Sequence, residues 1–455
     1  MGKNTRRLLN HSIRIRIHQQ KNWNCILKTY IVDASTDQLD PNIALDKERQ
    51  KALKKRCKKI LNNLCGILET VLDNSYEICK FILFSNKIGN LLDFLIHRLN
   101  NLIPDNIIQL TINQIKSSGV NIQLDANAGK LLHILTSTLT TLSTKQNPSN
   151  TDKTNDCDDF NLRMQDMISY IVSIGIVDKL SQFFNCVQGP INNETEVATF
   201  LLDCISFLSE LIKLNSECSS STSNRKTEDS TQLIATFRVT NMVGSVSFLY
   251  GLLLHSGTSS RTEGTPPPQL PKQIEVLAFL TLCMLNHMAV MNLQAFQSIL
   301  GSEGLSLQLR HITSHLLWYC SHFTSEALLH EIILLVGYFT VLNAENQSII
   351  QAGQRPTVLQ QLCCLPFLYF SDTELTDILF PTLIACCYKN PANKTILQQE
   401  MTSELLSNYI EVKYLNAEEN RIKENKTSVN DKRWLFSVRF PKCHWSSAKH
   451  YFSNA

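Results

Sequence analysis

Apolar residues recur at helical spacing in long blocks along this chain, and polar segments separate the blocks. Clear blocks cover Asn90–Ile96, Ile174–Leu180, Val197–Leu214 and Ile274–Leu285. Apolar positions at i, i+3 and i+4 predict helices with one buried stripe. No comparable stretch alternates with period two over several strands, so the pattern predicts an all-α fold.

Four stretches are rich in Ser, Thr, Asn or Pro and poor in apolar residues. They lie near 145–160, 215–230, 257–272 and 411–431. Such composition cannot bury enough apolar surface to order the backbone. We expect the first three to be disordered loops within one helical domain and the fourth to be a linker.

The most informative pattern is a repeat near the end of the chain. Asn343–Gln351 recurs 47 residues later as Asn390–Gln398. The apolar pairs Ile332 with Leu379 and Val336 with Leu383 keep the same offset, and Gln297–Leu300 is a partial third copy. A period of about 40–47 residues is typical of armadillo and HEAT repeats. Asn346 and Asn393 are expected to cap the repeat helices, because Asn is favoured at helix N-termini.

The repeat predicts an armadillo/HEAT-like α-solenoid from residue 42 to 410. Before it we expect a basic, disordered N-terminal arm over 1–41, and after it the linker 411–431 and a C-terminal helix within 432–455. The arm contains no acidic residue before Asp33. An organelle-targeting segment is the alternative for the arm, although 13–17 alternates with period two instead of forming an amphipathic helix.

Composition supports long helices in a reducing compartment. The 455 residues include only 15 Gly and 13 Pro, and the net charge is +3. The 15 cysteines are odd in number, lie mostly among apolar residues and form no Cys-x-x-Cys pair, which indicates core thiols and a cytoplasmic location. The best apolar run, Ile332–Leu342, is shorter than the roughly 20 residues that a transmembrane helix needs.

The late repeats resemble a known family. Within Glu331–Met401, the segments Val336–Asn343, Pro356–Leu362 and Leu379–Ala385 are similar to the C-terminal region of the S-phase cyclin A-associated proteins of the endoplasmic reticulum. The final segment is similar too. Its matching residues are Arg439, Phe440, Pro441, Trp445 and Phe452.

This resemblance implies a non-enzymatic scaffold or adaptor. Its implied partners are a cyclin A–kinase complex or the messenger-decay machinery, the latter through ribosome-linked control involving a deadenylase complex. It also implies a cytoplasmic location peripheral to the endoplasmic reticulum. The family's long N-terminal part, with a zinc finger, a charged coiled-coil region and a hydrophobic segment, has no counterpart in this sequence, which leaves membrane association open.

A run of lysines gives the strongest local charge signal. On a helix, six of them fall within an arc of about 140°, and apolar residues from Leu53 to Val71 fall on a separate arc. The six are Lys47, Lys51, Lys54, Lys55, Lys58 and Lys59. Such a stripe suits phosphate backbones, so RNA or the ribosome is the alternative partner. Anionic lipid and a simple solvated face are the other interpretations.

A second motif lies near the C-terminus. Arg433, Leu435 and Phe436 match the cyclin-docking pattern Arg-x-Leu-Phe, in which a groove takes the two apolar side chains. The alternative is that Trp434, Leu435 and Phe436 form the buried side of the last helix. Short motifs of this kind also arise by chance.

The sequence carries no enzymatic signature. It contains no Gly-rich phosphate loop, no Gly-x-Ser-x-Gly elbow and no His-Glu-x-x-His, and no cofactor is indicated. His311 and His315 share a helix face at zinc-compatible spacing. Without a matched Cys pair or a Glu after the first His, they are more simply explained as half-buried helix residues.

Overall fold

In the computed structural model, the described residues are 87–102, 126–144, 154–186, 195–221, 242–254, 266–422 and 431–453, together with positions 76, 79, 80 and 83. Within these ranges the chain is helical and forms no strand, which confirms the all-α prediction. The predicted arm 1–41 and the basic helix 47–59 lie outside the described residues.

The first part of the chain contributes six described helices. They are α4 (Lys87–Leu102), α6 (Ala126–Thr144), α7 (Thr154–Ser173), α8 (Ile176–Cys186), α9 (Thr195–Ser221) and α11 (Met242–Leu254). From residue 272 the helices follow one another with short connections. They are α12 (Lys272–Met291), α13 (Leu293–Leu300), α14 (Leu305–His322), α15 (Glu326–Thr340), α16 (Ala344–Gln351), α17 (Val358–Cys363), α18 (Leu368–Ser371), α19 (Thr373–Cys387), α20 (Pro391–Glu400), α21 (Glu404–Ile422), α22 (Phe436–Arg439) and α23 (Trp445–Ser453).

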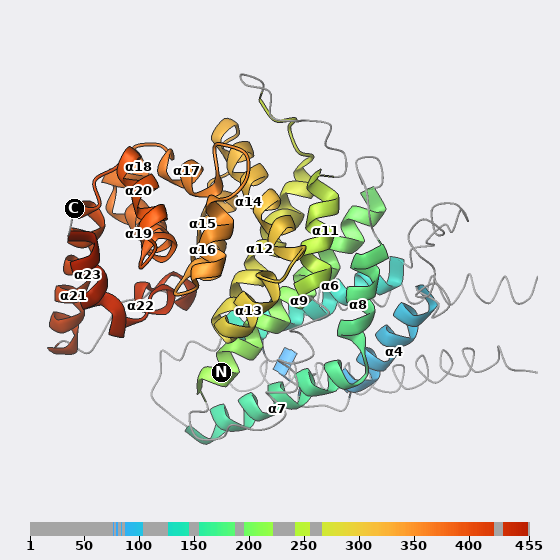
Figure 1. Ribbon diagram of the computed structural model, residues 1–455. Helices are drawn as coiled ribbons and strands as arrows, with labels where there is room; N and C mark the ends of the chain where they lie inside the picture. The colour runs from blue at the N-terminus through green and yellow to red at the C-terminus, as the bar shows by residue number, and fades with distance from the viewer. Residues whose placement is uncertain are drawn as a thin grey trace, which may run out of the picture.

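The helices pack in two rows, and the chain advances from the blue to the red end of Figure 1. In the first row, α6, α9, α12, α15 and α19 each pack against the next. In the second row, α8, α11, α14, α17 and α20 do the same. One continuous core of Leu, Ile, Phe and Val side chains fills the space between the rows. Each helical pair therefore buries its apolar stripe mainly against its neighbours.

The predicted 47-residue offset corresponds to equivalent positions in space. Ile332 and Leu379 are fully buried on α15 and α19, which pack against each other. Both helices end in the same way, with Leu342 and Lys389 at φ 54° and 59°. A left-handed residue at this point turns the chain sharply into the next short helix.

The expected capping residues were wrong by three positions. Asn343 and Asn390 are the N-caps of α16 and α20, and their side-chain oxygens accept hydrogen bonds from the backbone N–H groups of Asn346 and Asn393. Asn346 and Asn393 lie one turn inside the helices and are buried. Their side-chain amides do not cap the helices but donate hydrogen bonds to the preceding helical pair.

Buried amides link each helical pair to the next, and we call this set the amide ladder. The Gln297 and Gln347 side chains each donate to two carbonyls at the end of the following first-row helix. The acceptors stand 47 residues apart: Tyr338 and Val341 for Gln297, and Ala385 and Tyr388 for Gln347. In return, Asn346 donates to the carbonyl of Gln297, and Asn393 donates to that of Gln347.

Several predicted boundaries differ from the structure. The predicted linker begins inside α21, which continues to Ile422. The predicted loops near 145–160 and 215–230 overlap α7, which starts at Thr154, and α9, which runs to Ser221. The predicted single C-terminal helix is instead four short pieces: the 3-10 turns Lys432–Trp434 and Lys442–His444, and the helices α22 and α23. Pro441 separates α22 from the second 3-10 turn, because proline lacks the N–H that a continuous helix requires.

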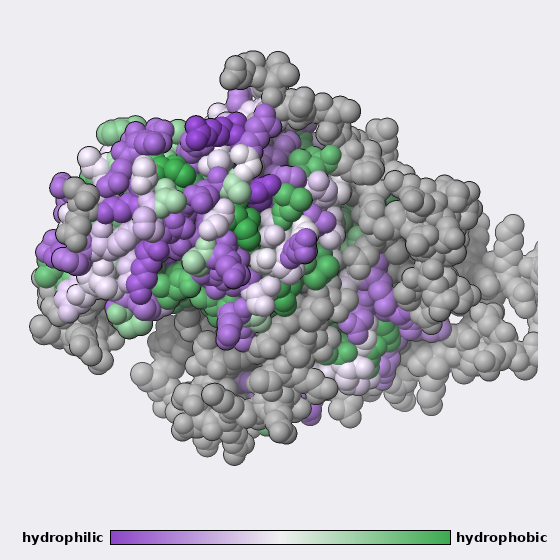
Figure 2. All heavy atoms as spheres, viewed as in Figure 1, coloured by the Kyte–Doolittle hydropathy of each residue, from purple (hydrophilic) through white to green (hydrophobic). Residues whose placement is uncertain are grey.

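One described helix, α12, is long and apolar enough to cross a membrane, and the bent pair α7–α8 passes the same test as a broken span. Of the α12 stretch, 61% is buried inside the fold, between α9 and α15. That burial is the pattern of a core helix. On the face shown in Figure 2, hydrophilic and hydrophobic side chains are interspersed over the described helices.

Candidate functional site

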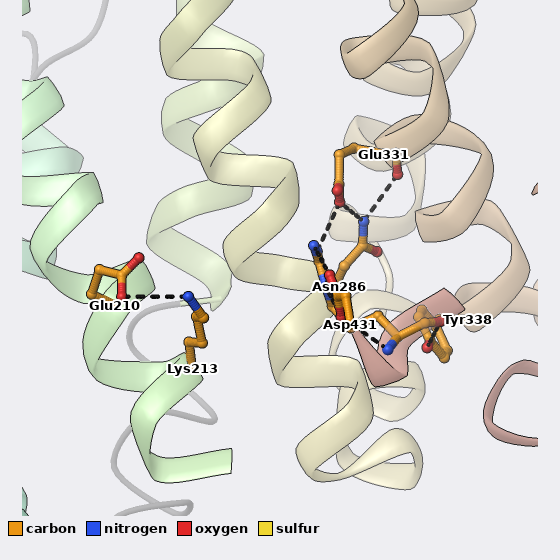
Figure 3. A network of polar contacts seen from close by, with 7 residues as sticks. Glu210, Lys213, Asn286, Glu331, Tyr338 and Asp431 are labelled. Carbon is orange, nitrogen blue, oxygen red and sulfur yellow. Dashed lines mark hydrogen bonds and ion pairs between the residues drawn. The ribbon is translucent and has the colours of Figure 1, made fainter. Parts of the chain in front are cut away.

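Residues 431–440, which we call the C-terminal segment, lie across the first row of helices. The 3-10 turn at its start contacts α12, and α22 contacts α19. Figure 3 shows Asn286 on α12 linked to Glu331 on α15, together with Tyr338 of α15 and Asp431 of the segment. The segment therefore touches three consecutive first-row helices, and polar side chains join it to α15 and α19.

Arg433 is the centre of this site. Its guanidinium donates to the Asp431 carboxylate at 2.9 and 2.7 Å and to Glu331 Oε2 at 3.0 Å. Only 8% of the residue is exposed. Burial acts to lower the pKa of Arg433, but its hydrogen bonds and the charges of Asp431 and Glu331 outweigh burial and raise it. The same pairing outweighs burial at Asp431 and lowers its pKa.

Asn286 on α12 holds the Glu331 carboxylate in place. The Asn286 side chain donates to Glu331 Oε2 at 2.7 Å and to the Glu331 backbone carbonyl at 3.0 Å. The Tyr338 hydroxyl donates to the backbone carbonyl of Arg433 at 2.7 Å. The site thus recognises a guanidinium and a main-chain carbonyl together. One helix earlier in the row, Glu210 and Lys213 form a looser ion pair at 3.8 Å.

Arg439 is buried differently, since its acceptors are neutral. Its guanidinium donates to the backbone carbonyls of Asp377 and Ile378 at 2.9 and 2.7 Å, and to Thr382 Oγ1 at 2.7 Å. Burial lowers the pKa of Arg439 to about 10. Pro381 lies inside α19 and cannot donate to the carbonyl four residues earlier, so the Asp377 carbonyl is available to Arg439.

The predicted cyclin-docking residues belong to this segment. Arg433 is engaged as described, and Phe436 is 8% exposed, stacked on Trp445 with ring centroids 4.7 Å apart. Leu435 is half-buried at the start of α22. As the segment lies here, a partner's groove could take Arg433 and Phe436 only after they leave these contacts.

Sequence reasoning missed most of the residues that surround the segment. Asn286, Glu331, Tyr338 and Arg439 were not identified as site residues. One signal was present, because Glu331 stands alone at the head of the apolar run Ile332–Leu342. An acid in such a position requires a buried partner. The six lysines of the predicted stripe lie outside the described residues.

The described residues contain no cluster of His, Cys, Asp and Glu that could hold a metal ion. His311 stacks on Tyr250, and His315 contacts the Trp318 ring. Burial raises the pKa of the Cys386 thiol to about 12 and that of Cys363 to a similar value. Thiols with raised pKa are poor nucleophiles. The chemistry that this site offers is recognition of cationic side chains and peptide carbonyls.

No model of a known protein family matches the chain. The chain is 36% identical, over 416 residues, to the S phase cyclin A-associated protein in the endoplasmic reticulum of Homo sapiens. The match covers 87% of this chain, which confirms the relationship suggested by the resemblance of the late repeats. The same match covers only 29% of that relative's length.

Proposed function

We propose that this relative of a cyclin A-associated protein is a non-enzymatic scaffold, in which an armadillo/HEAT-like α-solenoid presents its first row of helices to protein partners. The partners proposed are a cyclin A–kinase complex or components of messenger decay, at a cytoplasmic site peripheral to the endoplasmic reticulum. The name of the human relative supports the cyclin and reticulum assignments. The observation that carries the proposal is the C-terminal segment, an irregular stretch of chain that side-chain hydrogen bonds hold against α15 and α19.

The repeat architecture supports the same proposal. The amide ladder joins successive helical pairs by the same kind of contact, with acceptor carbonyls 47 residues apart. Stacked repeats of this kind present extended surfaces instead of one enclosed cleft. Such a surface suits a binding role.

Direct binding of purified cyclin A–kinase complex to the full chain tests the proposal. We expect saturable binding by surface plasmon resonance, and Leu435→Ala should weaken it if Arg433, Leu435 and Phe436 dock. Leu435 is the appropriate probe because Arg433 and Phe436 are buried in the fold, so their loss would also destabilise it. Lys442→Ala, an exposed change nearby, is the control. No binding by the folded full chain would contradict the cyclin assignment.

A second role rests on the lysine stripe at 47–59. Its six cations on one arc favour contact with RNA or the ribosome. Changing Lys54, Lys55 and Lys58 together to Glu should abolish RNA binding, and affinity of the unmodified chain should fall steeply as salt rises. Equal RNA binding by the triple variant would remove this role.

A further inference from the structure

The helices beneath the C-terminal segment supply a binding position for one guanidinium. Glu331 is 4% exposed, and Asn286 fixes its carboxylate from the neighbouring helix. Both residues belong to the helical rows and not to the segment. A buried carboxylate without a cation is costly, so this position strongly prefers a cationic ligand. Asn286 is fully buried, and its Oδ1 has no hydrogen-bond donor among the described residues.

A second guanidinium position is encoded in α19. Because Pro381 lacks an N–H, the Asp377 carbonyl lacks the α-helical donor four residues after it. The Ile378 carbonyl and the Thr382 hydroxyl lie beside it and accept from the same Arg439 guanidinium. Three acceptors on one helix face thus converge on a planar donor. Arginine fits such an arrangement because its N–H groups have a fixed fork geometry.

Between the two guanidinium positions, α15 contacts the main chain of the C-terminal segment. The Tyr338 hydroxyl donates to the carbonyl of Arg433. The Trp434 ring lies 5.7 Å from the Arg439 guanidinium, which packs the segment against itself above the helices. A main-chain contact flanked by two side-chain positions is the general form of a peptide-binding surface.

We propose that this surface of α12, α15 and α19 is a receptor for peptides that carry two arginines six residues apart, and that residues 431–440 occupy it as an internal competitor. This deepens the proposed scaffold function and rests on it. A partner of this kind displaces the chain's own segment when it binds. Because a tethered ligand acts at an effective concentration near the millimolar range, the intact chain binds such a partner weakly.

A labelled synthetic peptide of residues 431–441 tests the proposal on the full chain by fluorescence anisotropy. The Arg433→Ala/Arg439→Ala chain should bind this peptide at least tenfold more tightly than the unmodified chain, since its own segment competes poorly. Adding Glu331→Gln to that chain should reverse the gain. A control peptide with both arginines replaced by alanine should not bind. A folded double variant that binds neither peptide, or both equally, would overturn the proposal.

Hydrogen exchange provides a second measurement that does not depend on the variants folding. Excess peptide added to the unmodified chain should raise amide exchange in 431–440 and leave the α16 and α20 amides unchanged. Unchanged amide exchange in 431–440 at saturating peptide would overturn the proposal. Light scattering that shows dimers of the peptide-free chain would also overturn it, because the surface would then bind a second copy of the chain. If the full chain binds the peptide but not the cyclin A–kinase complex, the proposed cyclin partner is refuted and the peptide-binding surface is still supported.

Discussion

Two regions of this molecule use buried side-chain donors to join elements that are far apart in the sequence, but they use different chemistry. In the amide ladder, Gln347 and Asn393 donate from neutral amides, and the same arrangement occurs one helical pair earlier. At the C-terminal segment, Arg433 and Arg439 donate from cations, and each arrangement occurs once. A neutral amide loses less solvation energy on burial than a cation does.

This difference determines what a mutation leaves behind. Removing a ladder amide leaves carbonyls without donors, which is a moderate cost. Removing Arg433 leaves the Glu331 carboxylate buried without its cation, which is a larger cost. Removing Arg439 leaves only neutral acceptors, although the residue itself is more deeply buried than Arg433.

The largest effect is expected from Arg433→Met. It should lower the free energy of unfolding by about 3–5 kcal/mol, measured by urea denaturation, because an uncompensated carboxylate remains in the interior. Arg439→Met is the matched comparison and should cost less, since methionine refills the volume and no charge is left unpaired. Equal losses for the two variants would show that burial, and not charge compensation, sets the stability of this site.

In the ladder, Gln347→Ala should cost about 1–3 kcal/mol, because it leaves two buried carbonyls without donors. Gln297→Ala should cost a similar amount, since its two contacts are equivalent. Ser348→Ala, an exposed neighbour, is the control and should stay within about 0.5 kcal/mol. A loss in only one of the two Gln variants would show that the ladder positions are not energetically equivalent.

The ladder could be predicted from the sequence in outline, because a repeated contact leaves a repeated pattern. The partial third copy correctly paired Gln297 with Gln347, which are 50 residues apart, and the 47-residue offset correctly paired Ile332 with Leu379. It could not distinguish which Asn of each Asn-x-x-Asn unit caps the helix. Both positions hold Asn, and only the packing of the next helical pair decides which one turns inward.

The C-terminal segment could not be predicted in the same way. Arg433 and Glu331 are 102 residues apart, and their contact is not repeated elsewhere in the described residues, so no periodic pattern in the sequence indicates the pair. The arginine pattern suggested an exposed docking motif, whereas the tertiary fold places Arg433 against α15. A lone acid at the head of an apolar run was the only local sign that a distant cation was needed.

The two regions should also differ in their response to acid. His287 follows Asn286 on α12, beneath the C-terminal segment. Burial, together with the charge of Arg433, lowers the pKa of His287 from 6.5 to about 3, whereas the ladder amides do not titrate. The unfolded chain therefore takes up a proton below pH 6.5 that the folded chain resists, and stability falls as the pH drops from 6.5 toward 3. At pH 5 the loss is about 2 kcal/mol.

Urea denaturation at pH 7.5 and pH 5 measures this loss. His311 and His330 also have lowered pKa values, so the comparison of interest is between the unmodified chain and His287→Gln. The variant should lose less stability at pH 5 than the unmodified chain. The same pH dependence in both would assign the acid response to other groups.

The smallest effect is expected where the ladder meets the turn before α16. Leu342 adopts φ 54°, a conformation that costs a residue with a Cβ roughly 1 kcal/mol relative to glycine. Its side chain is 43% exposed, so little packing would be lost on its removal. Leu342→Gly should therefore raise the free energy of unfolding by about 0.5–1 kcal/mol. Leu342→Ala removes the same side chain and keeps the Cβ, and it should give no gain. Equal stabilities for the glycine and alanine variants would mean that the turn carries no backbone strain, and that the ladder alone fixes the geometry at this junction.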